Sequence, residues 1–299
     1  MLAQQLLNGV ITGSVYALFA LGFTLVFSVH RVLNLAHGAV FMVGAFVGYY
    51  AVLSGLSIWL ASAFAAAFAG AASVLVQFVA IQRLRRHPHH IVEFAALVTT
   101  LGADLVFVSS MQRLSDAQTV RFPFGTFPIV FLDFFGLRVS LLQLVIVVTV
   151  AALLAFLIAY LYATTAGRQV RAVASNPRVS SLLGVNPTAV YVQTFFISGV
   201  MAGVAGILIA LSFNSINAQM GEPYMLRAFV IIVLGGLGSI PGCVIAAILF
   251  GIVQTLCIVY LPAGSTDIVI YSILFLVLLV RPSGIMGRES TVIGAGHRA

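Results

Sequence analysis

Long apolar runs, bounded by glycine, proline or arginine, make up most of this 299-residue chain. A run of about 20 apolar residues is long enough to cross the hydrocarbon core of a bilayer as a helix. Transmembrane barrels are built instead from strands of roughly ten residues that alternate in polarity. The sequence therefore predicts an all-α fold, a polytopic transmembrane helical bundle of about eight spans that forms a single domain over 1–299. The expected spans are 5–28, 38–54, 57–82, 91–113, 139–163, 188–213, a broken pair at 226–237 and 240–260, and 266–281.

The charged residues are few, and their kinds exclude several classes of protein. Only 7% of the residues are charged, against about 25% in soluble domains. All 14 basic residues are arginine, so neither a Walker A loop nor a lysine Schiff base is available. The arginines lie in short loops between the runs, which argues against a nucleic-acid partner. Because no nucleophile triad, pair of cleft carboxylates, dinucleotide loop or metal cluster stands out, we expect neither an enzyme nor a bound cofactor or metal.

The arginines of alternate loops predict the topology. Ten would lie on one side of the membrane and four on the other, and the positive-inside rule makes the richer side the cytoplasm. The N-terminus is then outside and the C-terminus inside, with loop 164–187 cytoplasmic and loop 114–138 outside. Prolines and glycines interrupt the aromatic outer loop, which we expect to pack as a hairpin or lid. The cytoplasmic set is Arg31, Arg83, Arg85, Arg86, Arg168, Arg171, Arg178, Arg281, Arg288 and Arg298, and the outer set is Arg113, Arg121, Arg138 and Arg227.

Two segments far apart in the chain repeat each other. Residues 33–47 read LNLAHGAVFMVGAFV, residues 216–230 read INAQMGEPYMLRAFV, and six of the 15 positions are identical. The predicted topology gives the two copies opposite directions across the membrane, which is the relationship of inverted repeats in transporters. We therefore expect two related halves, broken helices, and a substrate path near the glycine and proline breaks.

The predicted cytoplasmic loop carries the signals of a short capped helix. Asn176 suits the N-cap, Pro177 the first helical position, and Gly184 the left-handed residue after the helix. Leu182 and Leu183 would contribute to an apolar stripe flanked by arginines. Such a helix either docks in a groove of a partner protein or lies on anionic lipid, and the residues by themselves leave both interpretations open.

Polar and glycine-rich positions inside the apolar runs are candidates for a translocation path. The segment LGGLGSIPG at 234–242 cannot continue a helix, so it is either a break beside the path or a turn at the membrane surface. An aspartate within 91–113 is costly in hydrocarbon and is either functional or held by a polar partner. Glu222 and Arg227 are expected to pair with each other near the outer surface. The path candidates are Asn34, His37, Gly38, Asp104, Asn217, Gly221, Gly235, Gly236, Gly238 and Pro241.

Five segments together resemble one protein family, the branched-chain amino acid ABC permeases of the LivH type. The match covers nearly the whole chain in the right order, and LNLAHG and LGGLGSIPG together make it specific. The segments are LNGVITGSVYALFALGFTLVFSVHRVLNLAHGAVFMVGAF near the N-terminus, VSLLQLVIVVTV at 139–150, GRQVRAVASNPRVSSLLGVN at 167–186, AFVIIVLGGLGSIPGCVIAAILFGIVQTL at 228–256 and RPSGIMG at 281–287.

The resemblance implies a permease subunit of an ATP-driven importer for branched-chain amino acids in the bacterial inner membrane. The implied partners are two ATP-binding cassette ATPases, a second permease subunit, an extracytoplasmic substrate-binding protein and membrane lipid. The resemblance also implies that the loop through 174–184 contacts the ATPase. The coupling residues expected on this basis are Arg168, Arg171, Ala174, Asn176, Pro177, Leu182, Leu183 and Gly184.

The chain departs from the family pattern at two places. Asp104 stands where the family usually has a small hydroxyl residue, and SSLLG stands where many members carry alanine before the leucines. The first departure leaves the substrate open, since related permeases carry urea, short amides or other amino acids. Two other classes compete with an ABC permease. One is an ion-coupled carrier or channel that uses Asp104 or His37 as its ion site, and the other is a non-transporting scaffold.

Overall fold

The computed structural model describes residues 2–84, 89–128, 130–134, 136–262, 264–281 and 284–286. Four of the predicted cytoplasmic arginines, Arg85, Arg86, Arg288 and Arg298, lie outside the described residues. The elements are α1 (Leu2–His30), α2 (His37–Leu53), α3 (Ile58–Val76), the π-helix η1 (Gln77–Ile81), α4 (His89–Leu114), β1 (Phe131–Phe134), β2 (Leu137–Ser140), α5 (Leu141–Ala163), α6 (Thr165–Ser175), α7 (Pro177–Leu182), α8 (Pro187–Phe213), α9 (Gly221–Gly235), α10 (Ile240–Tyr260) and α11 (Ser265–Val280).

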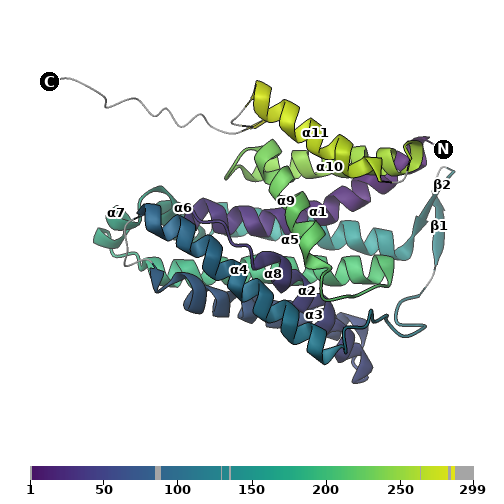
Figure 1. Cartoon of the computed structure of the whole chain (residues 1–299), viewed down its shortest axis with the longest axis horizontal. Helices are drawn as coiled ribbons and strands as arrows, with labels where there is room; N and C mark the ends of the chain where they lie inside the picture. Colours follow the sequence, from purple (N-terminus) through teal and green to yellow (C-terminus); the bar gives the residue numbers. More distant parts are fainter. Residues whose placement is uncertain are drawn as a thin grey trace.

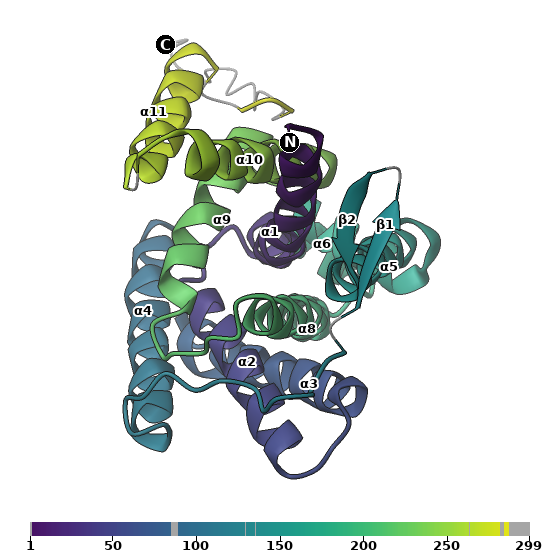
Figure 2. The ribbon, with the colours of Figure 1, turned by 90° about the vertical axis from the view of Figure 1, so that its right-hand side faces the viewer.

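The helices form a bundle whose members mostly run along the long axis of the molecule (Figure 1). Seen end-on, α1 and α8 lie near its middle (Figure 2). Within the described part, six helices are long and apolar enough to cross a membrane, and α2 and α11 supply shorter apolar helices. The N-terminus and the two strands lie at one end of the bundle, and α6 and α7 lie at the other (Figure 1). The fold is therefore the predicted all-α transmembrane bundle.

The start of α9 differs from the prediction. This helix begins at Gly221, ahead of the predicted start at 226, and it includes Glu222 and Pro223 in its first turn. The first four amide groups of a helix have no intrahelical acceptor, so a proline there loses no hydrogen bond. An acidic residue in the first turn also suits the helix dipole. These residues thus open the helix and do not belong to the preceding loop.

α1 and α8 are antiparallel neighbours, which confirms that the two halves of the chain are inverted. At one end of the pair, Nε2 of His30 lies 3.0 Å from Oγ1 of Thr194. At the other end, residues 8–15 of α1 and 209–213 of α8 line one cavity. The last residues of the two helices, 30 and 213, are 183 positions apart, as are the first residues of the two repeats, 33 and 216. The first half is α1–α4 and the second is α8–α11.

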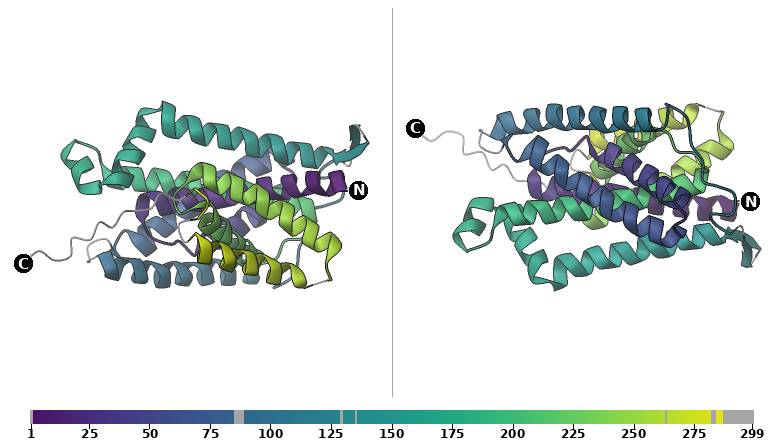
Figure 3. Two further views of the ribbon diagram at one scale, coloured as in Figure 1. Left: turned by 90° about the horizontal axis from the view of Figure 1, so that it is seen from above. Right: turned by 90° about the horizontal axis from the view of Figure 1, so that it is seen from below.

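The same packing pattern occurs in both halves. α1 packs against α10, and α8 packs in the corresponding way against α3. Small residues allow close approach in each pair, since Gly13 meets Gly251 in the first and Gly203 meets Ala69 in the second. Such residues are typical of tightly packed transmembrane helices. The connecting helices α5–α7 have no counterpart in the other half, and α5 runs along one edge of the bundle (Figure 3).

A β-hairpin, one of the two structures predicted for the loop 114–138, joins that loop to the start of α5. β1 and β2 pair antiparallel with Phe131 opposite Ser140. An exposed ion pair of 3.6 Å joins Arg138 to Asp133. The side chain of Gln4 on α1 holds the hairpin, because its amide donates to the Arg138 carbonyl at 2.8 Å and its Oε1 accepts from the Arg138 amide at 3.0 Å.

Candidate functional site

Two short helices begin inside the bundle and meet there. α2 begins at His37, whose Nε2 lies 3.1 Å from the carbonyl oxygen of Phe19 on α1. Phe19 precedes the end of α1 by about 16 Å at the helical rise, so α2 starts well inside the bundle. α9 begins at Gly221, and a Cβ added to Gly38 would lie 3.0 Å from the Gly221 carbonyl oxygen. The N-termini of α2 and α9 therefore touch.

The contact joins equivalent residues of the two repeats. Gly38 and Gly221 occupy the same position in the repeat alignment, and so do Phe41 and Tyr224. The rings of Phe41 and Tyr224 also touch, with centroids 4.9 Å apart. Residues related by a local two-fold axis meet their own equivalents only beside that axis. The axis that relates the inverted halves thus passes between α2 and α9 at this contact.

His37 is held on all sides at the start of α2. Its side chain is fully buried, and Nδ1 lies 3.4 Å from Oγ of Ser198 on α8. The rings of Phe19 and Phe23 pack against the imidazole at centroid distances of 4.6 and 5.8 Å. Both ring nitrogens therefore have partners, and the contacts fix α2 against α1 and α8.

The segment before α2 adds polar groups beside the same contact. The Leu35 amide donates to Oγ1 of Thr100 on α4 at 3.2 Å. Asn34 is 1% exposed, and neither its Oδ1 nor its Nδ2 has a hydrogen-bond partner within the described residues. The Asp104 carboxylate interacts with the Ala39 backbone amide. Ala39 is in the first turn of α2, where the helix dipole favours negative charge. The structure thus gathers five predicted path residues, Asn34, His37, Gly38, Asp104 and Gly221, and places Asn217 in the loop that leads to α9.

The LGGLGSIPG segment lies away from this contact, in the turn between α9 and α10. A Cβ on Gly238 would lie 3.4 Å from Oγ of Ser28, close to the end of α1. The carbonyls that end α9 accept hydrogen bonds of 2.8 and 3.2 Å from the backbone amides of Ile285 and Met286. At 1.5 Å per residue, the turn is about 20 Å from Gly221 along α9. The structure therefore separates Gly235, Gly236, Gly238 and Pro241 from the other path candidates.

Arg227 does not form the predicted ion pair with Glu222, since the sole ion pair in the described part of the chain is the one in the hairpin. Its Nη1 donates to Oη of Tyr16 at 3.1 Å. The guanidinium carbon lies 5.8 Å from the ring centroid of Tyr16 and 5.4 Å from that of Tyr224. Arg227 is thus inside the bundle and not at the outer surface where it was predicted. The repeat alignment contained the missed signal, because it places Arg227 within a helix at the position of Gly44.

The loop 164–187 contains the predicted capped helix, α7. Oδ1 of Asn176 accepts hydrogen bonds of 3.0 and 3.1 Å from two amides of its first turn, and Pro177 is its first residue. Gly184 has a φ of 84°, as expected for the residue after the helix. Leu182 is 86% exposed and Leu183 is 77% exposed. Two large apolar side chains therefore project from one end of the bundle with no cover within the described chain.

The same loop contains a second helix, α6, that was not predicted from the sequence. Oγ1 of Thr164 caps it by accepting a hydrogen bond from the Gly167 amide at 3.0 Å. Arg171 donates to the Leu161 carbonyl, and its guanidinium lies 5.2 Å from the Tyr162 ring centroid. Of the other predicted coupling residues, Arg168 is exposed and Ala174 packs against the core. Arg171 thus holds the corner between α5 and α6.

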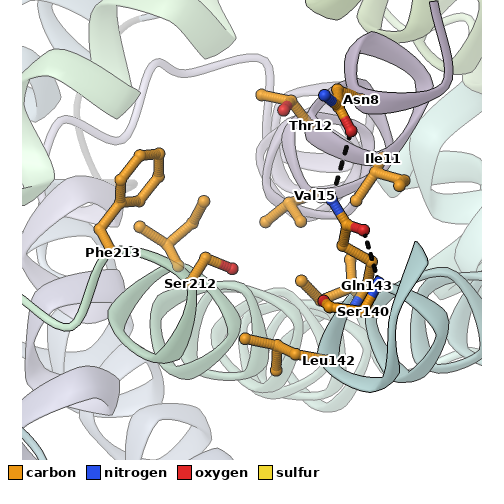
Figure 4. A pocket seen from close by; sticks show the side chains of 11 residues that line it. Asn8, Ile11, Thr12, Val15, Ser140, Leu142, Gln143, Ser212 and Phe213 are labelled. Atoms are coloured by element: carbon orange, nitrogen blue, oxygen red, sulfur yellow. Dashed lines mark hydrogen bonds between the residues drawn. The ribbon is translucent and has the colours of Figure 1, made fainter. Parts of the chain in front are cut away.

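A cavity of about 200 Å³ opens between α1, α5 and α8 (Figure 4). Its polar lining includes Asn8, Thr12 and Gln143, and Nε2 of Gln143 donates to Oδ1 of Asn8 at 3.3 Å. The lining contains no charged side chain and none of the predicted path residues. The cavity is therefore separate from the contact between α2 and α9.

Inverted halves whose short helices meet inside a membrane bundle define a membrane transport protein. Residues 5–279 match the family described as branched-chain amino acid transport system, permease component. The chain is 34% identical over 294 residues to the high-affinity branched-chain amino acid transport system permease protein LivH of Escherichia coli strain K12, with 95% of each chain covered. It is 30% identical over 297 residues to the corresponding permease protein BraD of Pseudomonas aeruginosa, again with 95% of each covered.

A more distant similarity covers half of the chain. The autoinducer 2 import system permease protein LsrD of Escherichia coli O9:H4 is 35% identical over 170 residues, which is 53% of this chain and 50% of LsrD. No solved structure matches the chain. The chain belongs to the branched-chain amino acid transport system permease family.

Membership settles the general role. The chain is the permease component of an ABC importer and a multi-pass protein of the inner membrane. The family is a transport permease and not itself an enzyme. Its relatives are components of ABC transport systems that depend on a binding protein. Membership therefore implies two kinds of partner, an ATPase and a substrate-binding protein.

Proposed function

We propose that residues 1–299 form one transmembrane permease domain that imports leucine, isoleucine, valine or a similar small zwitterion. Its relatives LivH and BraD are named as high-affinity branched-chain amino acid permeases, and they match the chain over 95% of its length. In the proposed assembly, this chain and a second permease subunit pair with two cytoplasmic ATPases. A substrate-binding protein delivers the solute at the opposite face.

Exposed leucines on α7 are the observation that carries this proposal. Leu182, the last residue of α7, and Leu183, its C-cap, project from the end of the bundle, and Asn176 and Gly184 flank the helix as capping residues. Exposed apolar side chains on a short rigid helix suit a groove in a partner protein. The proposed coupling element therefore comprises α6 and α7, with the leucines as the contact and Arg171 as a brace behind it.

The contact between α2 and α9 supports a path along the local two-fold axis. Gly38 and Gly221 let the two helix N-termini approach, and a small change in their distance would open or close the centre of the bundle. ATP-driven closure of the partners would pull on α7 and rock the two halves about this contact. Asn34, Asp104 and Asn217 are the proposed polar residues of the path. The glycines of LGGLGSIPG are its proposed hinge at the end of α9.

Reconstituted uptake tests the proposal. The assembled permeases, ATPases and binding protein are placed in vesicles, and ATP-dependent uptake is measured for branched-chain amino acids, other amino acids, short amides and urea. We expect uptake of a branched-chain amino acid. Preferred uptake of urea or an amide would assign the chain to a related substrate class of the same family.

A matched pair of variants tests the coupling role. Gly184→Val should abolish uptake while insertion persists, because a β-branched residue is strained at positive φ. Gly184→Asn should retain most uptake, since asparagine tolerates this conformation. A normal uptake rate for Gly184→Val with full ATPase association would show that α7 is not the coupling element. Uptake by the purified chain without an ATPase would favour an ion-coupled carrier or channel.

A further inference from the structure

We propose that Arg227 binds the carboxylate of the transported solute inside the membrane, an inference that rests on the proposed function. The guanidinium presents a fixed positive charge to a transient anionic ligand, the carboxylate of a small zwitterion. Four independent features of Arg227 support this role. It lies deep in the bundle, it has no acidic partner in an ion pair within the described residues, it can be reached from the surface of α9, and its counterpart in the first repeat is a glycine.

Arg227 lies at the middle of the bundle. Its hydrogen-bond partner Tyr16 is the central residue of α1, which spans Leu2–His30. Tyr16 is therefore about 21 Å from either end of that helix. The phosphate groups of membrane lipids lie at the two surfaces, so they do not reach a guanidinium at this depth. The anion that meets Arg227 must enter through the protein.

The charge of Arg227 has no acidic partner in an ion pair within the described residues. Asp267 is close enough to Tyr16 to act on it electrostatically, but forms no ion pair with Arg227. The two tyrosine rings supply cation–π contacts, which are weaker than a carboxylate pair. A charged side chain at this depth is costly and is typical of a substrate or ion pathway. The guanidinium thus has hydrogen-bond donors left for an incoming carboxylate.

The surface of α9 gives access to Arg227. Its exposed residues Glu222, Pro223, Leu226 and Phe229 form a stripe along one face of the helix. Arg227 follows Pro223 by four residues, so it borders this stripe, and it is itself partly exposed. α9 lies between α4 and α11 (Figure 2). Because the stripe carries a carboxylate, we assign it to the aqueous path and not to lipid.

The symmetry of the fold shows that packing alone does not require an arginine here. The equivalent residue in the first repeat is Gly44, which packs directly against Gly203 of α8. α9 instead carries a long cationic side chain that reaches Tyr16. A buried acceptor lies beside the same tyrosine, because Gln254 hydrogen-bonds to Tyr16 while its Oε1 has no partner within the described residues. The Arg227 guanidinium and Oε1 of Gln254 thus both lie beside the Tyr16 hydroxyl. The guanidinium suits the carboxylate of a zwitterion, and the free oxygen suits its ammonium group.

Chemical modification of the assembled wild-type transporter tests the proposal. Vesicles that contain the whole complex are treated with 2,3-butanedione, an uncharged arginine reagent, and modification is mapped by mass spectrometry. We expect leucine during ATP turnover to slow modification of Arg227 several-fold, and leucinamide, which lacks the carboxylate, to leave it unchanged. Arg121, exposed in the outer loop, serves as the internal control. Equal protection of Arg227 by leucinamide would overturn this inference, and so would a lack of protection by leucine in vesicles that import leucine. Neither result would contradict the proposed function.

The same vesicles separate this inference from the proposed function. If the complex imports urea or another solute without a carboxylate, the inference is wrong and the importer role stands. If the complex imports no solute of the panel, both are contradicted.

Substitutions give a second and independent test. Arg227→Gln should lower the uptake rate at least tenfold, as expected for loss of a charged hydrogen bond. Arg227→Lys should restore part of the uptake, whereas Arg138→Gln on the exposed hairpin should have no effect. Full uptake by Arg227→Gln would contradict the proposal. If that variant fails to assemble, the protection experiment on the wild-type complex decides.

Discussion

Gly38 and Gly221, which are 183 residues apart, touch where α2 and α9 begin, and a Cβ on either one would meet the backbone of the other. Both occupy the sixth position of their repeat. The pair therefore marks the local two-fold axis and explains why both repeats carry glycine at this point. A side chain on either residue would push apart the two helix ends.

Gly221→Ala should destabilise the bundle and impair transport. The added methyl group would collide with the Gly38 carbonyl, and overpacking of this kind costs about 1–3 kcal/mol. Thermal unfolding in detergent and reconstituted uptake measure the two effects. Gly102→Ala on α4 is the matched control, since no atom lies within 4 Å of its added Cβ; it should be neutral or slightly stabilising. Equal behaviour of the two variants would show that the glycine contact is not tight in the membrane.

The double variant Leu182→Ser, Leu183→Ser should release the ATPase without unfolding the permease. Both side chains are more than three-quarters exposed, so their removal should leave the thermal midpoint unchanged. Co-purification of the ATPase is expected to fall at least tenfold, because buried apolar contact area would be lost at the interface. Phe124→Ser, at a fully exposed position in the outer loop, should leave co-purification intact. Undiminished ATPase binding by the double variant would place the contact elsewhere.

Cysteine labelling in intact cells should show that α7 and the outer loop face opposite compartments. Thr119→Cys is exposed in the outer loop, and an impermeant maleimide should label it directly. Ser181→Cys is exposed on α7 and should react only after the membrane is permeabilised. The native Cys243 and Cys257 are buried, so background labelling should be low. The reverse pattern would invert the predicted topology.

Gln4→Ala should loosen the hairpin at the end of the bundle where the N-terminus lies. The substitution removes two hydrogen bonds to Arg138, each worth about 0.5–1.5 kcal/mol. Trypsin should then cleave after Arg138 several-fold faster in purified protein. Asp133→Ala removes only the exposed ion pair, which contributes little, and should leave the cleavage rate unchanged. Faster cleavage in Asp133→Ala but not in Gln4→Ala would mean that the ion pair holds the hairpin.

Local signals in the sequence were sufficient for much of the fold. Asn176, Pro177 and Gly184 predicted α7 because caps act within a few residues of the backbone they satisfy. α6 was missed, since its only N-terminal signal is one threonine in a polar loop. The early start of α9 was missed because a proline opens a helix as readily as it ends one.

The candidate site was predicted less completely. The repeat identified Asn34, Gly38 and Gly221, which the structure does bring together with His37 and Asp104. The glycines of LGGLGSIPG read as a break beside the path, but they lie about 20 Å away along α9. Counting glycines and prolines along the chain did not show how deep in the membrane this turn lies. Arg227 was assigned to the outer surface by counting arginines, although the repeat aligns it with Gly44 inside a helix.

The sequence by itself determined that this chain crosses a membrane as helices, that its halves are inverted, and that a capped helix projects from one loop. These properties depend on hydrophobic run length, residue identity and backbone capping, which are local. Only the tertiary structure decided that α2 and α9 begin inside the bundle and that Arg227 meets Tyr16 at its centre. Because 62% of the residues are hydrophobic and only 7% are charged, nearly every helix face is compatible with burial. Which helices pack against each other therefore depends on where particular glycines allow close approach.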